Sequence, residues 1–384
     1  DKCGHTAMHF ASKAGAIDTM KLLNTLGLHY DEYDHLGRRP IHYAATASSA
    51  DALEFLAHTT GLPRYNLADN NGKYTIHYAA EYGRIKTIYF LFLLEQRDLH
   101  LRDKEGKSIL DYAVEGGQIS TFDWLMKQTH FDLYAVDNEK RNCLHHAARA
   151  NQTAMVEHLL THYKMDTKRP DRMGLFAVHH AVIKSAKETM QALVARGDSY
   201  QERSEGVGMT PIHIACKLGL KAMFLFLAGK GVNTKVQNNR GQSGGFYAAA
   251  SADVEMLQFL SEQGMPLTDV CDGKKDTPLH FAVISSSLSK VKFLLRIGAD
   301  INARNKKGLT PGDVALARKN DALANRQEEK SIAYASICTH FARLRGEKHV
   351  IFKSSLSIET VKTIEKRPPN NSDNNDRERK QPKV

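Results

Sequence analysis

Cysteine and tryptophan are scarce in this chain of 384 residues, which has five cysteines and one tryptophan. The cysteines lie far apart and form no CxxC pair, which argues against a disulfide framework and against a cysteine zinc site. Scattered cysteines of this kind are typical of a reducing compartment, so the sequence predicts a cytoplasmic protein.

Long hydrophobic runs are also missing. The longest nearly unbroken apolar stretch is residues 89–94, far below the roughly 20 residues that a membrane helix needs. The chain begins with Asp1 rather than Met, and no charged-then-apolar leader follows, so no signal peptide is predicted. Hydrophobic residues make up 42% and charged residues 25%, which excludes disorder of the whole chain.

What the sequence does contain is an internal repeat of 33 to 35 residues. Its units align on one anchor column that is usually histidine, at His9, His42, His77, Asp111, His145, His179, His213, Phe246, His280 and Asp313. So regular a period indicates a linear array of repeats rather than the two or three domains that length alone suggests.

Each unit follows the same plan. A polar turn with glycine comes first, as in residues 69–72, and Thr-Pro opens a helix in the clearest copies, as at Thr277-Pro278. Threonine caps helices, and proline fits the first helical turn because its missing N–H would have no partner there. A second helix with bulky apolar residues then ends at glycine, as at Gly298.

The pattern D-x-x-G-x-T-P-L-H-x-A…L-L-x-x-G-A-D, best seen in residues 272–304, resembles the ankyrin repeat. The resemblance implies an all-α solenoid of turn–helix–helix units, with hairpin tips and inner helices lining a concave groove. It covers ten units over residues 1–320. Residues 321–350 are predicted to form a C-terminal capping helix, amphipathic from Ala322 to Arg345, and the polar tail at 351–384 is predicted to be disordered.

Some copies depart from the family pattern. The turn glycine is replaced by Lys140 and Lys275, and the eighth copy begins its first helix with Gly244-Gly245. Because glycine lowers helix propensity by about 1 kcal/mol against alanine, we expect the eighth unit to be the softest of the stack.

Catalytic chemistry is not predicted. The 19 histidines suggest a metal site, but adjacent units stack about 8–10 Å apart, which is too far for successive anchor rings to share one ion. In the family that the chain resembles, the anchor ring instead bonds backbone and threonine groups. Gly106-Lys107-Ser108 lacks the earlier glycine of a phosphate loop. We therefore predict no enzyme, no catalytic residue, no cofactor and no metal.

The net charge of +10 raises the question of where the excess lies. By family resemblance, five positions per unit face the groove, and basic residues outnumber acidic ones there by sixteen to five. The sequence thus predicts a basic concave groove, interrupted at Glu81, Glu105 and Glu115. The alternative is that these residues are ordinary solvated surface lysines and arginines.

A second column, one residue after the anchor, is aromatic in six copies: Phe10, Tyr43, Tyr78, Tyr112, Tyr247 and Phe281. Such rings either supply rigid contacts to a peptide or pack between units. Aromatic and basic residues together also occur in proteins that bind single-stranded nucleic acid, but no recognised nucleic-acid module accompanies them, so nucleic acid is not favoured as a partner.

The leading hypothesis is a non-catalytic scaffold or adaptor whose basic groove holds an acidic segment of a protein partner. The predicted contacts are Arg38, Lys73, Arg141, Arg149, Arg172, Lys184, Lys217 and Arg240, with Tyr43, Tyr78 and Tyr82 as apolar anchors. Two alternatives stay open: a recognition module of a larger protein (a channel, an enzyme or a microbial effector), and binding to an anionic membrane surface. The sequence predicts no oligomeric state.

Overall fold

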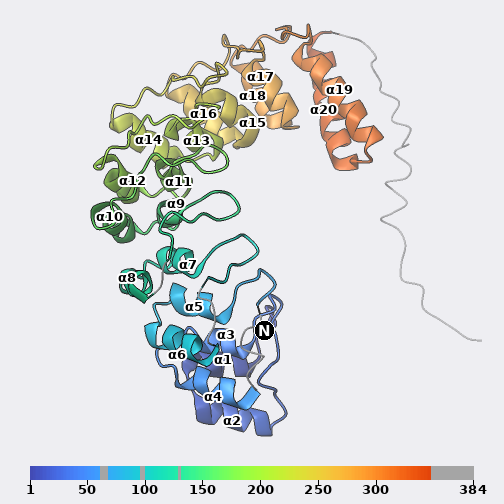
Figure 1. Cartoon of the computed structure of the whole chain (residues 1–384). Coiled ribbons are helices and arrows are strands. Elements are labelled where there is room, and N and C mark those ends of the chain that lie inside the picture. Colours follow the sequence, from blue (N-terminus) through green and yellow to red (C-terminus); the bar gives the residue numbers. More distant parts are fainter. Residues whose placement is uncertain (61–67, 96–99, 129–130, 347–384) are drawn as a thin grey trace, which may run out of the picture. The chain divides into compact units, whose positions relative to one another are not determined.

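A computed structural model describes residues 1–60, 68–95, 100–128 and 131–346 of the chain. These residues form 20 helices and no strand (Figure 1), which confirms the all-α prediction. Residues Asp1–Ile337 form one compact unit, and a second unit begins at Cys338. The tail at 351–384, predicted to be disordered, lies outside the described residues.

One helix of each consecutive pair, the inner helix, directly follows a hairpin turn. The inner helices are α1 (Ala7–Ala14), α3 (Pro40–Ala44), α5 (Thr75–Glu81), α7 (Ile109–Glu115), α9 (Cys143–Arg149), α11 (Ala177–Ile183), α13 (Pro211–Lys217), α15 (Gly244–Ser251), α17 (Pro278–Ile284) and α19 (Pro311–Ala324). Each inner helix contacts the next one in chain order, from α1 to α19. The repeat therefore builds a one-dimensional stack, in which the core lies between neighbouring units.

The second helix of each pair is the outer helix. These are α2 (Ile17–Thr25), α4 (Asp51–Thr60), α6 (Ile85–Glu95), α8 (Ile119–Gln128), α10 (Thr153–Thr161), α12 (Lys187–Val194), α14 (Lys221–Gly229), α16 (Val254–Glu262), α18 (Leu288–Arg296) and α20 (Glu328–Leu344). The outer helices α2 to α18 each pack on their inner partner. Within α10, Met155, Val156 and Leu159 are fully buried, at the spacing that places apolar residues on one helix face.

The anchor histidine ties each hairpin to its own helix and to the next unit. In His213, Nδ1 accepts a hydrogen bond from the Thr210 backbone N–H at 3.0 Å, so the proton is on Nε2, which donates to the Gln242 carbonyl oxygen at 3.0 Å. Burial lowers the pKa of His213 to about 4, which keeps the ring neutral. His9, His145, His179 and His280 make the equivalent bonds. His77 accepts the same backbone bond, but its Nε2 donates to the Leu101 carbonyl oxygen at 3.1 Å.

The hairpin turns are held together by a carboxylate and joined to one another by backbone bonds. Asp69 Oδ1 accepts the backbone N–H groups of Asn71 and Lys73 at 2.8 and 2.9 Å. The Asn70 N–H donates to the Leu36 carbonyl oxygen of the preceding hairpin at 2.9 Å. Where the turn glycine is replaced, Lys140 and Lys275 adopt the same left-handed conformation, with φ of 58° and 59°.

The two glycines that open α15 have a packing reason. A Cβ atom at Gly244 would lie 2.5 Å from Cys216 Sγ, and a Cβ at Gly245 would lie 2.6 Å from Leu267 Cδ2. Both distances are far below van der Waals contact, so a larger residue at either position would require the Cys216 or Leu267 side chain to move. The softness that we expect of this unit stays a prediction.

The C-terminal helix differs from the prediction of one continuous helix from Ala322 to Arg345. Ala322 belongs to the end of α19, and α20 starts only at Glu328. The helix is interrupted because Arg326 takes a left-handed φ of 55°, which ends an α-helix. Tyr334 of α20 donates its hydroxyl to the Ile284 carbonyl oxygen at the end of α17, at 2.9 Å.

Candidate functional site

The surface that carries the predicted contacts consists of the hairpin turns and the adjoining residues of the inner helices, and we call it the hairpin face. A column of aspartates lies along it, eight residues before the anchor. In Asp34, Asp69 and Asp103, Oδ1 holds the turn and Oδ2 accepts a hydrogen bond from a tyrosine hydroxyl at 2.7 Å. The donors are Tyr43, Tyr78 and Tyr112 respectively. The aromatic column is thereby fixed to the turns of its own units.

Histidine replaces tyrosine in this column at His146 and His180. His180 Nε2 lies 2.8 Å from Asp171 Oδ2. His146 is fully buried, with Nδ1 2.9 Å from Glu115 Oε1 and Nε2 3.2 Å from Asp137 Oδ2. Burial alone would lower the pKa of His146, but these two carboxylates together with Asp111 outweigh it and raise the pKa to about 9. The ring is therefore a buried cation at neutral pH.

In the first four units, the predicted basic contacts are engaged by acidic neighbours. Arg38 Nε lies 2.7 Å from Asp34 Oδ2. Lys73 pairs with Glu81, and its ammonium lies 4.1 and 4.3 Å from the ring centroids of Tyr78 and Tyr112. These two residues keep their place on the hairpin face, but their charges are already partnered.

Arg141 requires a correction. Its column predicts a groove contact, yet its side chain is only 9% exposed. Its Nε lies 2.7 Å from Asp137 Oδ2, and its Nη2 lies 3.6 Å from Glu105. Arg141 thus holds its hairpin together and presents no free charge.

The other five predicted basic contacts share a different environment. Arg149, Arg172, Lys184 and Arg240 are exposed and Lys217 is half-buried. Arg149 and Lys217 end α9 and α13, and Lys184 caps the C-terminus of α11. Arg172 lies 3.9 Å from the exposed Glu139, and within the described residues none of the other four forms an ion pair. We call these five residues the basic stripe.

The three predicted tyrosine anchors differ in exposure. Tyr78 is buried at 9%, Tyr43 is half-buried, and Tyr82 is 45% exposed. The aspartate column, and the part that His146 and His180 play in it, were not predicted from the sequence. A signal for both was present, because aspartate recurs eight residues before the anchor and tyrosine or histidine one residue after it.

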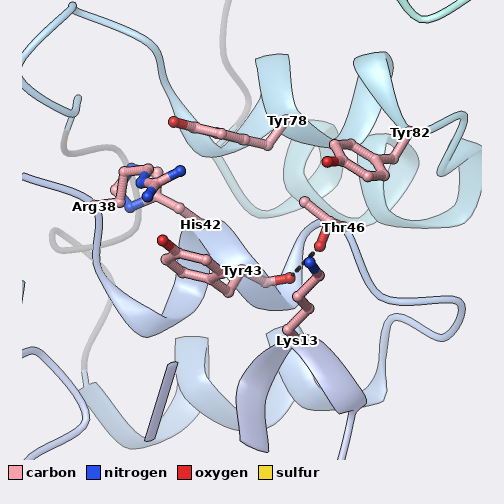
Figure 2. Close-up of a pocket in the computed structure, with 7 residues that line it drawn as sticks. All are labelled: Lys13, Arg38, His42, Tyr43, Thr46, Tyr78 and Tyr82. Carbon is pink, nitrogen blue, oxygen red and sulfur yellow. Dashed lines mark hydrogen bonds between the residues drawn. The ribbon is translucent and has the colours of Figure 1, made fainter. Parts of the chain in front are cut away.

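Two hollows lie on the hairpin face. A cavity of about 90 Å³ is lined by Lys13, Arg38, His42, Tyr43, Thr46, Tyr78 and Tyr82 (Figure 2). A longer groove of about 500 Å³ adjoins it, shares Arg38, Tyr78 and Tyr82, and continues to Glu115. The groove contains the partnered charges of units two to four, so its electrostatic character differs from that of the basic stripe.

One group of metal-ligand types occurs among the described residues, at Asp1, Cys3 and His5, with ligand atoms within 4.8 Å of one another. His5 Nδ1 is bound to Asp1 Oδ2 at 2.9 Å, and its Nε2 faces the Arg38 guanidinium at 3.0 Å. The adjacent fixed cation disfavours a metal ion there.

No helix in the described part of the chain has the length and apolar character needed to cross a membrane.

A family model and several known proteins match parts of this chain. A family model described as "Ankyrin repeats (3 copies)" matches residues 129–204 and 212–305. The palmitoyltransferase ZDHHC13 of Mus musculus is 38% identical over 71 residues, which is 18% of this chain and 11% of that protein. The E3 ubiquitin-protein ligase hecd-1 of Caenorhabditis elegans is 34% identical over 90 residues, 23% of this chain and 3% of its own length.

Among solved structures, the human ASB11 ankyrin repeat domain aligns with a TM-score of 0.44 at 22% identity, covering 54% of this chain and 91% of that one. The matched stretch is a small part of each curated relative named here. The repeat pattern, the helix pairs and the family match agree: the chain contains ankyrin repeats, a module that is generally non-catalytic and mediates protein–protein interaction.

Proposed function

We propose that this protein is a binding scaffold whose basic stripe holds an acidic segment of a protein partner. The observation that supports this is the contrast within one face: Arg38, Lys73 and Arg141 have acidic partners, whereas in the basic stripe only Arg172 has one among the described residues. Unpaired charge of one sign attracts an oppositely charged partner and raises its encounter rate by about tenfold or more.

The repeat also sets a spacing for the partner. Arg149 and Lys217 are the last residues of α9 and α13, and Lys184 lies one position later in its unit, at the C-cap of α11 between them. Neighbouring packed helices lie about 8–10 Å apart, and an extended chain rises about 3.3 Å per residue. An extended partner segment would therefore meet one of these cations at about every third residue.

A second proposal is that these repeats are part of a larger protein. The chain matches only small parts of multidomain relatives, which include a palmitoyltransferase and a ubiquitin ligase. This supports the alternative that the repeats serve as the recognition module of a larger protein, with the basic stripe selecting what that protein acts on.

Affinity purification followed by mass spectrometry tests the stripe. The stripe variant combines Arg149→Glu, Lys184→Glu and Lys217→Glu. The control variant combines Lys86→Glu, Lys127→Glu and Lys292→Glu, which are exposed residues of the outer helices α6, α8 and α18 and change the net charge equally. We expect wild type and control to retain proteins with acidic segments, and the stripe variant to lose them.

Two further measurements, a salt dependence and a vesicle co-sedimentation, distinguish the possible partners. Retention by the wild type should weaken at about 0.5 M salt, because the Debye length falls to a few ångströms. Capture of the same proteins by all three variants would contradict the proposal. Co-sedimentation with phosphatidylserine vesicles that only the stripe variant loses would assign the stripe to an anionic membrane surface instead.

A further inference from the structure

The cavity of about 90 Å³ on the first three units lies apart from the basic stripe and has its own chemistry. It is lined from three inner helices and one hairpin: Lys13 comes from α1, Tyr43 from α3 and Tyr78 from α5, while Arg38 precedes α3. Figure 2 shows the rings of Tyr43 and Tyr78 on opposite sides of the cavity. A volume of this size, smaller than the roughly 150 Å³ of a cavity known to hold benzene, fits a group of a few heavy atoms.

The two ring walls are held in place before any ligand arrives. The Tyr43 hydroxyl donates to Asp34 and the Tyr78 hydroxyl donates to Asp69, both at 2.7 Å. Burial first, and then these hydrogen bonds, raise the pKa of both tyrosines above their usual range. Rings fixed in this way lose little conformational freedom when a group enters between them.

Two cationic side chains, Arg38 and Lys13, also line this cavity. Arg38 donates Nε–H to Asp34 at 2.7 Å, and its guanidinium carbon lies 5.0 Å from the Tyr43 ring centroid, which fixes its position. A guanidinium has five N–H donors, and Asp34 and His5 engage only part of them. On the other side, Figure 2 shows the Lys13 ammonium near Thr46, with the Tyr82 hydroxyl above it. Lys13 is exposed and forms no ion pair within the described residues.

These features select one class of occupant. An incoming cation would gain from the ring faces but would be repelled by Lys13 and Arg38. A purely apolar group would leave the Lys13 ammonium without a partner and the remaining N–H donors of Arg38 unused. A carboxylate on a short apolar stem satisfies the whole site, because its methylene groups contact the rings while its oxygens meet the cations at the rim.

We propose that this cavity is a binding pocket for the side chain of a glutamate within a bound protein segment. The adjoining groove of about 500 Å³ shares Arg38, Tyr78 and Tyr82 with the cavity, so residues that flank the glutamate continue into it. None of the lining residues belongs to the basic stripe, and this pocket does not depend on the function proposed for the stripe.

The test uses the full chain labelled with 3-fluorotyrosine, in which ¹⁹F signals of Tyr43, Tyr78 and Tyr82 are assigned from their Phe variants. The probes are a capped Ala-Ala-Glu-Ala-Ala peptide, its Gln counterpart, N-acetylglutamate and inorganic phosphate. We expect the Glu peptide to shift the signals of Tyr43, Tyr78 and Tyr82 saturably. The Gln peptide should bind about tenfold more weakly, because it lacks the charge-assisted bonds.

A charge reversal in the cavity and a matched one outside it complete the test. Lys13→Glu should weaken the Glu peptide about tenfold or more, whereas Lys86→Glu on α6 should leave its affinity unchanged. Equal binding of the Glu and Gln peptides, or no effect of Lys13→Glu, would overturn the pocket. Binding of N-acetylglutamate or phosphate as tight as that of the peptide would overturn its assignment to a protein segment, since flanking contacts would then contribute nothing.

Discussion

At the scale of single residues, two histidine positions have opposite roles. The anchor ring stays neutral because it accepts one hydrogen bond and donates another in a buried site, which lowers the pKa of His77, His179 and His213 to about 4. His146 is buried among carboxylates, and its pKa is raised to about 9. The same residue type is thus a neutral connector in one column and a cation in the next.

His146 gives a pH-dependent prediction. Its folded pKa of about 9 lies above the ordinary value near 6.5, so the stability it contributes is fully present below pH 6.5 and is lost as pH rises through 9. The contribution is on the order of 3 kcal/mol by linkage. We expect urea unfolding to show the wild type losing stability between about pH 6.5 and 9, with His146→Asn nearly flat over this range. Parallel pH profiles would contradict the assignment.

A second prediction compares Ser243 with Thr210, which both lie three residues before the anchor of their unit. In the eighth unit the anchor is Phe246, and the buried Ser243 hydroxyl has no hydrogen-bond partner. Thr210, in the same column, lies 2.8 Å from His213 Nδ1. Ser243→Ala should leave the unfolding free energy unchanged or raise it by up to about 1 kcal/mol, whereas Thr210→Ala should lower it by about 1–2 kcal/mol. Equal losses in both variants, measured by urea denaturation, would refute this interpretation.

At the scale of elements, the spacing between units is set where backbone meets backbone. Hairpins are joined by N–H to carbonyl bonds such as that from Lys104 to Asn71, at 3.0 Å. The ends of inner helices approach still more closely at Gly116, where a Cβ atom would lie 1.9 Å from the Glu81 carbonyl oxygen. A substitution there must move a whole unit, because a carbonyl cannot rotate away as a side chain can.

Two glycine substitutions separate this packing effect from helix propensity. Gly116→Ala should lower the unfolding free energy by at least about 2 kcal/mol through the clash with α5. Gly229 ends α14, and a Cβ atom there would have no neighbour within 4 Å, so Gly229→Ala should be neutral or stabilising by about 0.5 kcal/mol. Thermal or urea unfolding of both variants measures the difference, and a harmless Gly116→Ala would show that the units are more loosely stacked than described.

At the scale of the whole molecule, the organising feature is how charge is distributed along the stack. In the first four units, carboxylates such as Glu81 and Asp34 engage Lys73 and Arg38. From the fifth unit on, Arg149, Lys184 and Lys217 have no such partners within the described residues. The function proposed above therefore places the partner's acidic segment on the basic stripe rather than along the whole hairpin face.

The fold could be predicted from the sequence because a period of 33 to 35 residues with a fixed histidine constrains every unit in the same way. The distribution of free charge could not. Counting side chains by column treats Arg141 as equivalent to Arg149, whereas Arg141 is held by Asp137 at 2.7 Å. Likewise, the apolar pattern at the C-terminus continues past Arg326, and only its backbone conformation separates α19 from α20.

The most direct test of the account is the affinity of the protein for two labelled peptides of the same composition, each of about 14 residues. One places glutamate at every third position and the other gathers the glutamates in one block. At about 50 mM salt, fluorescence anisotropy should show the spaced peptide binding the wild type about tenfold more tightly than it binds the Arg149→Glu, Lys184→Glu, Lys217→Glu variant. Equal affinity of the spaced peptide for both proteins would contradict the account. Equal affinity of the two peptides for the wild type would contradict the claim that the partner meets a cation at about every third residue.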